Sequence, residues 1–203
     1  MTIIYYTSNR EDETFEEKIR GELVKNRSGL PVISVSQKPI DLGENVCVGE
    51  HEASTYNTKK QIYEGLKRAT TEYVVMAEAD FLYPKEYFEF EPKGDKFYCV
   101  ENVYIAWINR SKFYRKLGSE GAMICHRESL MEIMETYLTE WDMRTKMKSL
   151  LFHPESIKVT LETPVVTFKT GNGVSWRCSY IKGSSIKDIP HWGNAGKLRK
   201  RFQ

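Results

Sequence analysis

The sequence predicts an α/β protein with a mixed, mostly parallel sheet and helices on both faces. Short apolar runs rich in β-branched and aromatic residues alternate with segments whose apolar residues recur at helical spacing. The chain opens in the order strand, helix, strand, which favours parallel strands joined by crossover helices. Its 203 residues suffice for one sizeable core, so we predict a single domain over residues 1–203.

The N-terminal elements are predicted from apolar pattern and turn residues. Residues 2–7 (TIIYYT) form an apolar run typical of a buried first strand. Phe15, Ile19 and Leu23 then share one helical face, and the run VISVS is predicted as the second strand. Residues 38–56 are punctuated by Gly and acidic residues and are predicted as a loop.

The middle and the end of the chain continue the alternation. A helix is predicted over residues 57–69, leading directly into a buried strand at Tyr73–Met76. The later elements are predicted from shorter patterns: one or two strands within 97–107, a strand at 121–125, helices at 129–138 and 141–151, a strand at 159–168 interrupted by Pro164, and a loop-rich basic end.

Composition limits the class of protein. The chain is 40% hydrophobic and 29% charged with a formal net charge of +2, which is ordinary for a globular domain. From Lys182 onward, however, the sequence contains six Lys or Arg residues and only one acid. This composition is typical of tails that bind phosphate and also of tails that are merely solvated. The four cysteines lack zinc-like spacing and indicate reduced thiols. Without a leader or a long apolar segment, we expect a cytoplasmic protein with no membrane span.

Two acids, Glu78 and Asp80, follow the predicted buried strand at Tyr73–Met76. A carboxylate taken out of water needs a cation, a helix N-terminus or a metal ion as partner. Two oxygen ligands at this spacing suit Mg²⁺ or Mn²⁺, and nucleotides bind at the C-terminal edge of parallel sheets. The alternative is a strand that simply ends, with both acids exposed or capping.

The stretch NTKKQIYEGLKRATTEYVVMAEADFL, residues 57–82, resembles the core signature of nucleotide-sugar glycosyltransferases with the GT-A fold, especially family 2. The residues in register are Asn57, Gly65, Leu66, Ala69, Glu72, Tyr73 and Asp80. Glu78 departs from the pattern, since the family usually has Asp there. The resemblance extends more weakly over residues 3–150 and implies a Rossmann-like GT-A fold. It divides the chain into a nucleotide-sugar half (1–110), an acceptor half (111–180) and a basic segment closing over the donor (181–203).

The resemblance implies a metal-dependent hexosyl- or pentosyltransferase that uses a nucleoside-diphosphate sugar, expected to be UDP-linked. Mn²⁺ or Mg²⁺ is the expected cofactor, with Asp80, Glu78 and His191 as its ligands. The residues expected to contact the donor nucleotide are Thr7, Ser8, Asn9, Asn57, Gly193 and Lys197. A lone His is more often a structural or surface group, so His191 keeps that alternative.

Three further residues are candidates for the chemistry. Asp142 is predicted as the base that deprotonates the acceptor hydroxyl, with Glu140 as its substitute. Asp142 also fits a helix N-cap, and a retaining enzyme needs neither acid as base. Arg177 follows a Gly-flanked Asn and suits a phosphate partner; the alternative is a glycine hairpin around a core Trp.

The acceptor is the least determined part of the prediction. The basic end suggests a polyanion, and one hypothesis is a viral enzyme that glycosylates a hydroxymethylated base in DNA. A nucleotidyltransferase of similar fold is the rival enzyme, although TSNRED after the first strand lacks the expected glycine. The non-enzymatic rival is a nucleic-acid binding module. The oligomeric state is left open.

Overall fold

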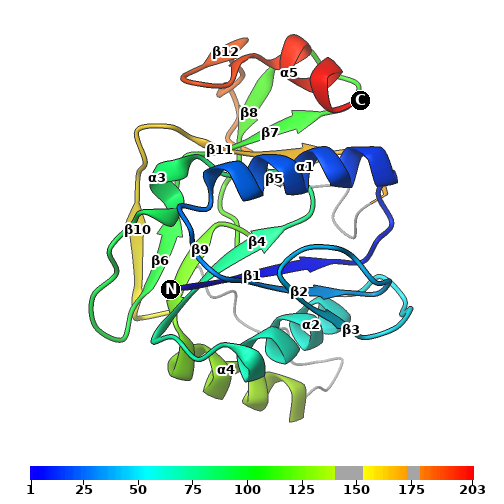
Figure 1. The fold of residues 1–203 in the computed structure, drawn as a ribbon. Helices are drawn as coiled ribbons and strands as arrows, with labels where there is room; N and C mark the ends of the chain where they lie inside the picture. The colour runs from blue at the N-terminus through cyan, green and yellow to red at the C-terminus, as the bar shows by residue number, and fades with distance from the viewer. Residues whose placement is uncertain (140–152, 173–178) are drawn as a thin grey trace.

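The computed structural model describes residues 1–139, 153–172 and 179–203 (Figure 1). The predicted helix at 141–151 and the residues Asp142, Glu140 and Arg177 therefore lie outside the described residues. Within those ranges the chain forms a large sheet, a smaller second sheet and a short hairpin, with helices on both faces of the large sheet.

The large sheet is mixed and mostly parallel, as predicted. Its strand order is β10-β6-β9-β4-β1-β2-β3, and only β9 runs antiparallel to its neighbours, β4 and β6. The strands are β1 (Thr2–Thr7), β2 (Val32–Ser36), β3 (Glu44–Cys47), β4 (Tyr73–Glu78), β6 (Phe97–Val100), β9 (Met123–His126) and β10 (Ser156–Val159). Because β1, β2 and β4 are parallel, their carboxyl ends share one edge.

The second sheet has the order β5-β11-β7-β8. Its strands are β5 (Phe81–Leu82), β7 (Val103–Trp107), β8 (Phe113–Arg115) and β11 (Val165–Lys169). The chain passes from the large sheet to the second sheet between β4 and β5, so Asp80 lies at the crossing. The backbone N–H of Phe168 donates to the Asp80 carbonyl at 2.7 Å, which ties the crossing to β11.

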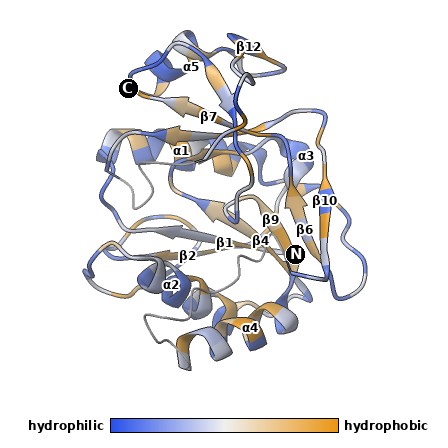
Figure 2. Ribbon diagram, turned by 180° about the vertical axis from the view of Figure 1, so that it is seen from behind, coloured by the Kyte–Doolittle hydropathy of each residue, from blue (hydrophilic) through white to orange (hydrophobic). Residues whose placement is uncertain are grey.

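The helices cover both faces of the large sheet, as predicted. They are α1 (Glu13–Asn26), α2 (Thr55–Arg68), α3 (Lys85–Phe88), α4 (Arg127–Thr139) and α5 (Ala195–Phe202). Figures 1 and 2 show α2 and α4 together beneath one face, where Leu66 and Met134 pack with Ile4 of β1. On the other face, α1 lies between the two sheets and contributes Leu23 to the core around Ile3.

Side-chain caps account for where the helices begin. The Asp12 carboxylate accepts the backbone N–H of Phe15 at the start of α1, and the Ser54 hydroxyl accepts that of Asn57 at the start of α2. The cap at Ser54 begins α2 two residues before the predicted start. The helix thus presents Thr55 and Thr58 in its first turn.

The structure differs from the prediction in three places. The predicted loop at 38–56 contains the edge strand β3, a four-residue strand (ENVC) with no fully buried position and no apolar run. The predicted strand at 159–168 is two strands, β10 and β11, in different sheets on either side of Pro164. The basic end contains α5, capped by Asn194, because Leu198 and Phe202 are buried against the second sheet.

The membrane prediction concerns helices alone. In the part of the chain that the structure describes, no helix is long and apolar enough to cross a bilayer.

Candidate active site at the edge of the large sheet

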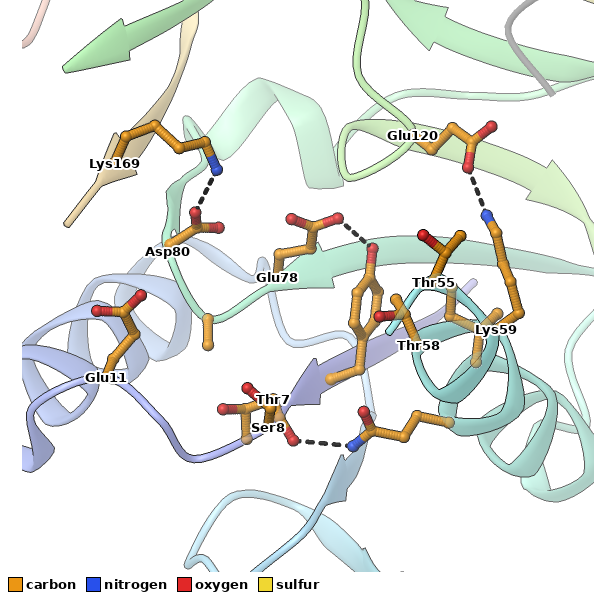
Figure 3. Close-up of a pocket in the computed structure, with 14 residues that line it drawn as sticks. Thr7, Ser8, Glu11, Thr55, Thr58, Lys59, Glu78, Asp80, Glu120 and Lys169 are labelled. Carbon is orange, nitrogen blue, oxygen red and sulfur yellow. Dashed lines mark hydrogen bonds and ion pairs between the residues drawn. The ribbon is translucent and has the colours of Figure 1, made fainter. Parts of the chain in front are cut away.

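A cavity of about 210 Å³ lies at the carboxyl ends of β1 and β4, beside the first turns of α2 (Figure 3). Most of the lining residues have polar side chains, and they come from both sheets, from α2 and from loops: Tyr6, Thr7, Ser8, Glu11, Thr55, Thr58, Lys59, Gln61, Ile62, Glu78, Ala79, Asp80, Glu120 and Lys169. This is the edge at which open α/β sheets bind their ligands. The pair of acids predicted from the sequence therefore lines this cavity.

Glu78 ends β4 and is held by two tyrosines. The Tyr6 hydroxyl donates to Glu78 Oε1 at 2.7 Å, and the Tyr83 hydroxyl accepts the backbone N–H of Glu78 at 2.9 Å. Burial, and next the negative charge of Asp80, raise the pKa of the Glu78 carboxyl above its ordinary value. A Cβ added to Gly121 would come within 2.7 Å of the Glu78 carboxyl, so glycine keeps space for this side chain.

Asp80 is paired with a buried lysine. Lys169 Nζ lies 2.7 Å from Asp80 Oδ2, and the Lys169 residue is only 8% exposed. Lys169 is the last residue of β11, so the two partners come from segments that meet where the sheets cross. Such a charge-assisted hydrogen bond is the arrangement that compensates a desolvated carboxylate.

Thr7 and Ser8 line the cavity at the end of β1. The Thr7 hydroxyl donates to Glu16 Oε1 at 2.9 Å and accepts the backbone N–H of Asn9 at 2.9 Å. Gln61 of α2 donates to the Thr7 carbonyl at 2.8 Å, which fixes α2 against this loop. Burial raises the pKa of the Glu16 carboxyl to about 7.

The far end of the cavity holds a second ion pair. Lys59 Nζ of α2 contacts Glu120 Oε2, from the loop before β9, and Lys59 is 5% exposed. Near Asp80, Glu11 Oε1 accepts the Thr170 hydroxyl at 2.8 Å, and burial raises the pKa of the Glu11 carboxyl. The cavity thus combines four carboxylates and two lysines, each lysine paired with a carboxylate, with hydroxyl and amide groups.

The three predicted ligands of the divalent ion do not lie together, because Glu78 and Asp80 line the cavity and His191 does not. Among the residues that the structure describes, no three His, Cys, Asp or Glu side chains gather in a way that could hold a metal ion. Asp80 and Glu78 lie in the cavity, but the charge of Asp80 is already compensated by Lys169, and Glu78 accepts from Tyr6. The residues present therefore do not fit a resident metal site, and metal dependence stays a prediction from the resemblance.

His191 lies elsewhere. It occupies the turn between β12 (Asp188–Ile189) and β13 (Gly193–Asn194), with a backbone φ of 63° and its ring edge-on to Trp192. Trp192 is buried and donates its indole N–H to the Pro164 carbonyl at 2.6 Å, which anchors the turn beside the second sheet. This placement matches the alternative of a structural or surface His.

Of the six described residues predicted to contact the donor nucleotide, two line the cavity and four do not. Thr7 and Ser8 line the cavity together with Glu78 and Asp80, whereas Asn9, Asn57, Gly193 and Lys197 do not. Asn9 Oδ1 instead accepts the backbone N–H groups of Gln37 and Lys38, each at 2.9 Å. The Asn57 amide donates to the Glu52 carbonyl at 2.7 Å. Both side chains stabilise loops beside the site.

Sequence reasoning missed the lysines and Glu120. Lys169 directly follows the predicted strand at 159–168, and a charged residue at the end of an apolar run was a usable signal. Lys59 is the basic residue that follows Asn57 in the family-like stretch. Glu120 stands immediately before the Gly–Ala pair at residues 121–122, but nothing in its spacing points to α2.

Solved structures share this fold. A fragment of S. aureus TarS in complex with UDP-GlcNAc superposes with a TM-score of 0.53 at 13% identity, covering 88% of this chain and 61% of that one. A glycosyltransferase involved in glycosylation of the major capsid of PBCV-1 gives 0.51 at 10% identity, covering 82% of this chain and 92% of that one. The chain thus has a GT-A-like glycosyltransferase fold, as predicted.

The same comparisons set the limits of this likeness. The chain spans 36% of the longer TarS structure and 61% of the TarS fragment. No protein-family model matches the sequence, and no curated protein is similar to it in sequence. The likeness at 10–13% identity concerns the fold.

Proposed function

We propose that the chain is a glycosyltransferase whose cavity binds a nucleoside-diphosphate sugar. The observation that supports this most is the Asp80–Lys169 pair beside Glu78, where the crossing between the sheets borders a polar cavity. A UDP-linked hexose or pentose is the proposed donor, because the TarS neighbour contains UDP-GlcNAc. In this proposal Thr7 and Ser8 lie at the nucleoside end of the cavity.

The proposed reaction moves one sugar. The bond between the anomeric carbon and the diphosphate oxygen breaks, and its electron pair stays on the diphosphate. A bond forms between the anomeric carbon and the acceptor oxygen, whose proton passes to a base. Asp142, or Glu140 in its place, is proposed as that base. Positive charge beside the departing diphosphate lowers the barrier, since charge develops there.

Nucleotide binding tests this proposal directly. Nucleoside diphosphates are added one at a time to the protein, with Mn²⁺ and with EDTA, and the melting temperature is measured. A ligand that binds only the folded state at about 100 times its Kd stabilises it by about 2.7 kcal/mol. We expect UDP to raise the melting temperature most. The absence of a rise with any nucleotide under either condition would falsify the proposed function.

For the acceptor, we propose a hydroxymethylated base in DNA, in line with the basic surface of α5. Leu198 and Phe202 face the core, which leaves Lys197 and Lys200 exposed to solvent. A helix that buries its apolar side and exposes lysines presents a positive face to a polyanion.

Salt dependence tests the DNA proposal. We expect DNA affinity, measured by fluorescence anisotropy, to fall at least tenfold between about 50 and 200 mM salt, because phosphate binding releases counterions. The variant Lys200→Ala is expected to weaken DNA binding at low salt and to leave UDP binding as it is. DNA affinity that does not change with salt would contradict this acceptor.

A further inference from the structure

We propose that Lys169 is the cation that neutralises the donor diphosphate, and that nucleotide binding in this chain needs no divalent ion. The inference rests on the proposed function and specifies how its site handles charge. The cavity contains the two acids of a metal-binding pattern, Glu78 and Asp80, but Asp80 already forms an ion pair with Lys169.

The position of Lys169 is fixed by its surroundings. It ends β11, its Nζ is 2.7 Å from Asp80 Oδ2, and the ammonium lies 6.0 Å from the centre of the Phe81 ring. The Phe168 N–H to Asp80 carbonyl bond holds the two backbones side by side. Figure 3 shows the Lys169 amino group directed at Asp80, on the side of the cavity where Glu11 also lies. An ammonium aimed in this way needs little rearrangement to meet a phosphate oxygen.

Charge supports the same conclusion. Asp80 accepts from Lys169, and Glu78 accepts from the Tyr6 hydroxyl. A divalent ion on Asp80 would lie a few ångströms from the Lys169 ammonium, and like charges repel strongly in a poorly solvated site. The lining also holds the carboxylates of Glu11 and Glu120, and Lys59 is paired with Glu120. In this scheme the diphosphate therefore shares the Lys169 ammonium with Asp80.

In the transfer step, Lys169 acts only on the leaving group. As the bond between the anomeric carbon and the diphosphate oxygen breaks, the electron pair moves onto that oxygen. The Lys169 ammonium donates a hydrogen bond to the diphosphate and remains protonated throughout. Asp80 keeps the ammonium oriented, which makes Asp80 a positioning residue in this scheme.

The test is UDP binding by calorimetry, in EDTA and then in Mn²⁺, for the wild type and for Lys169→Met. We expect the wild type to bind UDP in EDTA with an affinity that Mn²⁺ changes less than threefold. Lys169→Met should weaken binding in EDTA on the order of 10- to 100-fold, the effect of a lost charge-assisted hydrogen bond. In that variant Mn²⁺ should restore part of the affinity, because Asp80 is no longer paired.

Two further variants make the result specific. Lys85→Ala removes an exposed lysine from a carboxylate pair of similar length, 2.6 Å to Glu89, outside the cavity lining, and should leave UDP binding unchanged. The double variant Lys169→Met/Asp80→Asn should lose the rescue by Mn²⁺. Melting of each protein without ligand checks that it is folded, and the wild-type measurement in EDTA needs no variant.

The outcomes separate the two proposals. If the wild type binds UDP only with Mn²⁺, the inference about Lys169 is wrong and the proposed function stands. If Lys169→Met binds as the wild type does in EDTA, the inference is also wrong. Failure of every nucleoside diphosphate to bind in both conditions overturns the proposed function itself.

Discussion

Replacing Glu16 by Gln should stabilise the protein by about 3 kcal/mol at pH 8 and change its stability little at pH 4.5. Burial raises the pKa of this carboxyl from 4.5 to about 7 in the folded state. Between these values the folded protein keeps a proton that the unfolded chain has lost, so stability falls as pH rises. At about 1.4 kcal/mol per pKa unit, the full cost is present above pH 7.

The measurement is urea unfolding of both proteins between pH 4.5 and 8. Differences between them are compared rather than absolute curves, because burial also raises the pKa of Glu11 and Glu78. The matched control is Glu17→Gln, an exposed position on the same helix, which should leave the pH profile parallel to that of the wild type. If the unfolding free energies of Glu16→Gln and the wild type changed with pH in parallel, ionisation of Glu16 would not destabilise the folded protein, and the prediction would be wrong.

Replacing Lys59 by Met should destabilise the protein by about 2 kcal/mol. Removing one partner of a fully buried ion pair costs roughly 3–5 kcal/mol, because the other charge is left without compensation. The Lys59 side chain is 7% exposed, but that of Glu120 is 26% exposed, so water solvates part of the remaining charge. Met fits the stem of the lysine, which borders an apolar pocket lined by Ile62 and Leu130.

A double-mutant cycle separates the ion pair from the packing around it. Glu120→Gln and the double variant Lys59→Met/Glu120→Gln complete the cycle, with unfolding free energies from urea titration. We expect the double variant to be more stable than Lys59→Met alone, since no carboxylate charge then remains at position 120 after the loss of Lys59. Strict additivity of the two single changes would mean that the pair contributes nothing.

The sequence was sufficient for the parts of the fold that repeat a pattern. The parallel strands β1, β2 and β4 are mostly apolar, and α2 has its apolar residues at helical spacing, so both kinds of element could be predicted. The edge strand β3 and the terminal α5 could not. The strand β3 has only four residues and no buried one, and α5 depends on burial of Leu198 and Phe202 against a sheet distant in sequence.

The same distinction applies to the candidate site: residues that follow a local pattern could be predicted, and pairings between distant segments could not. Glu78 and Asp80 could be predicted because they follow a buried strand, where a carboxylate is costly. Lys169 lies 89 residues from Asp80 in sequence, and no local spacing records that pairing. His191 was predicted from an offset in a terminal segment; the structure places it beside Trp192 and outside the cavity lining, and its role as a metal ligand stays a prediction.

Because the chain crosses between the sheets from β4 to β5, the relative position of the two sheets sets the spacing of the site residues. Glu78 belongs to the large sheet, whereas Asp80 is bonded through its carbonyl to β11 of the second sheet. A sliding of one sheet against the other would change the spacing of the two carboxylates and move Lys169 with it. Substitutions in the packed layer between the sheets, such as at Phe15 or Phe168, would then tune the affinity for a ligand they never touch.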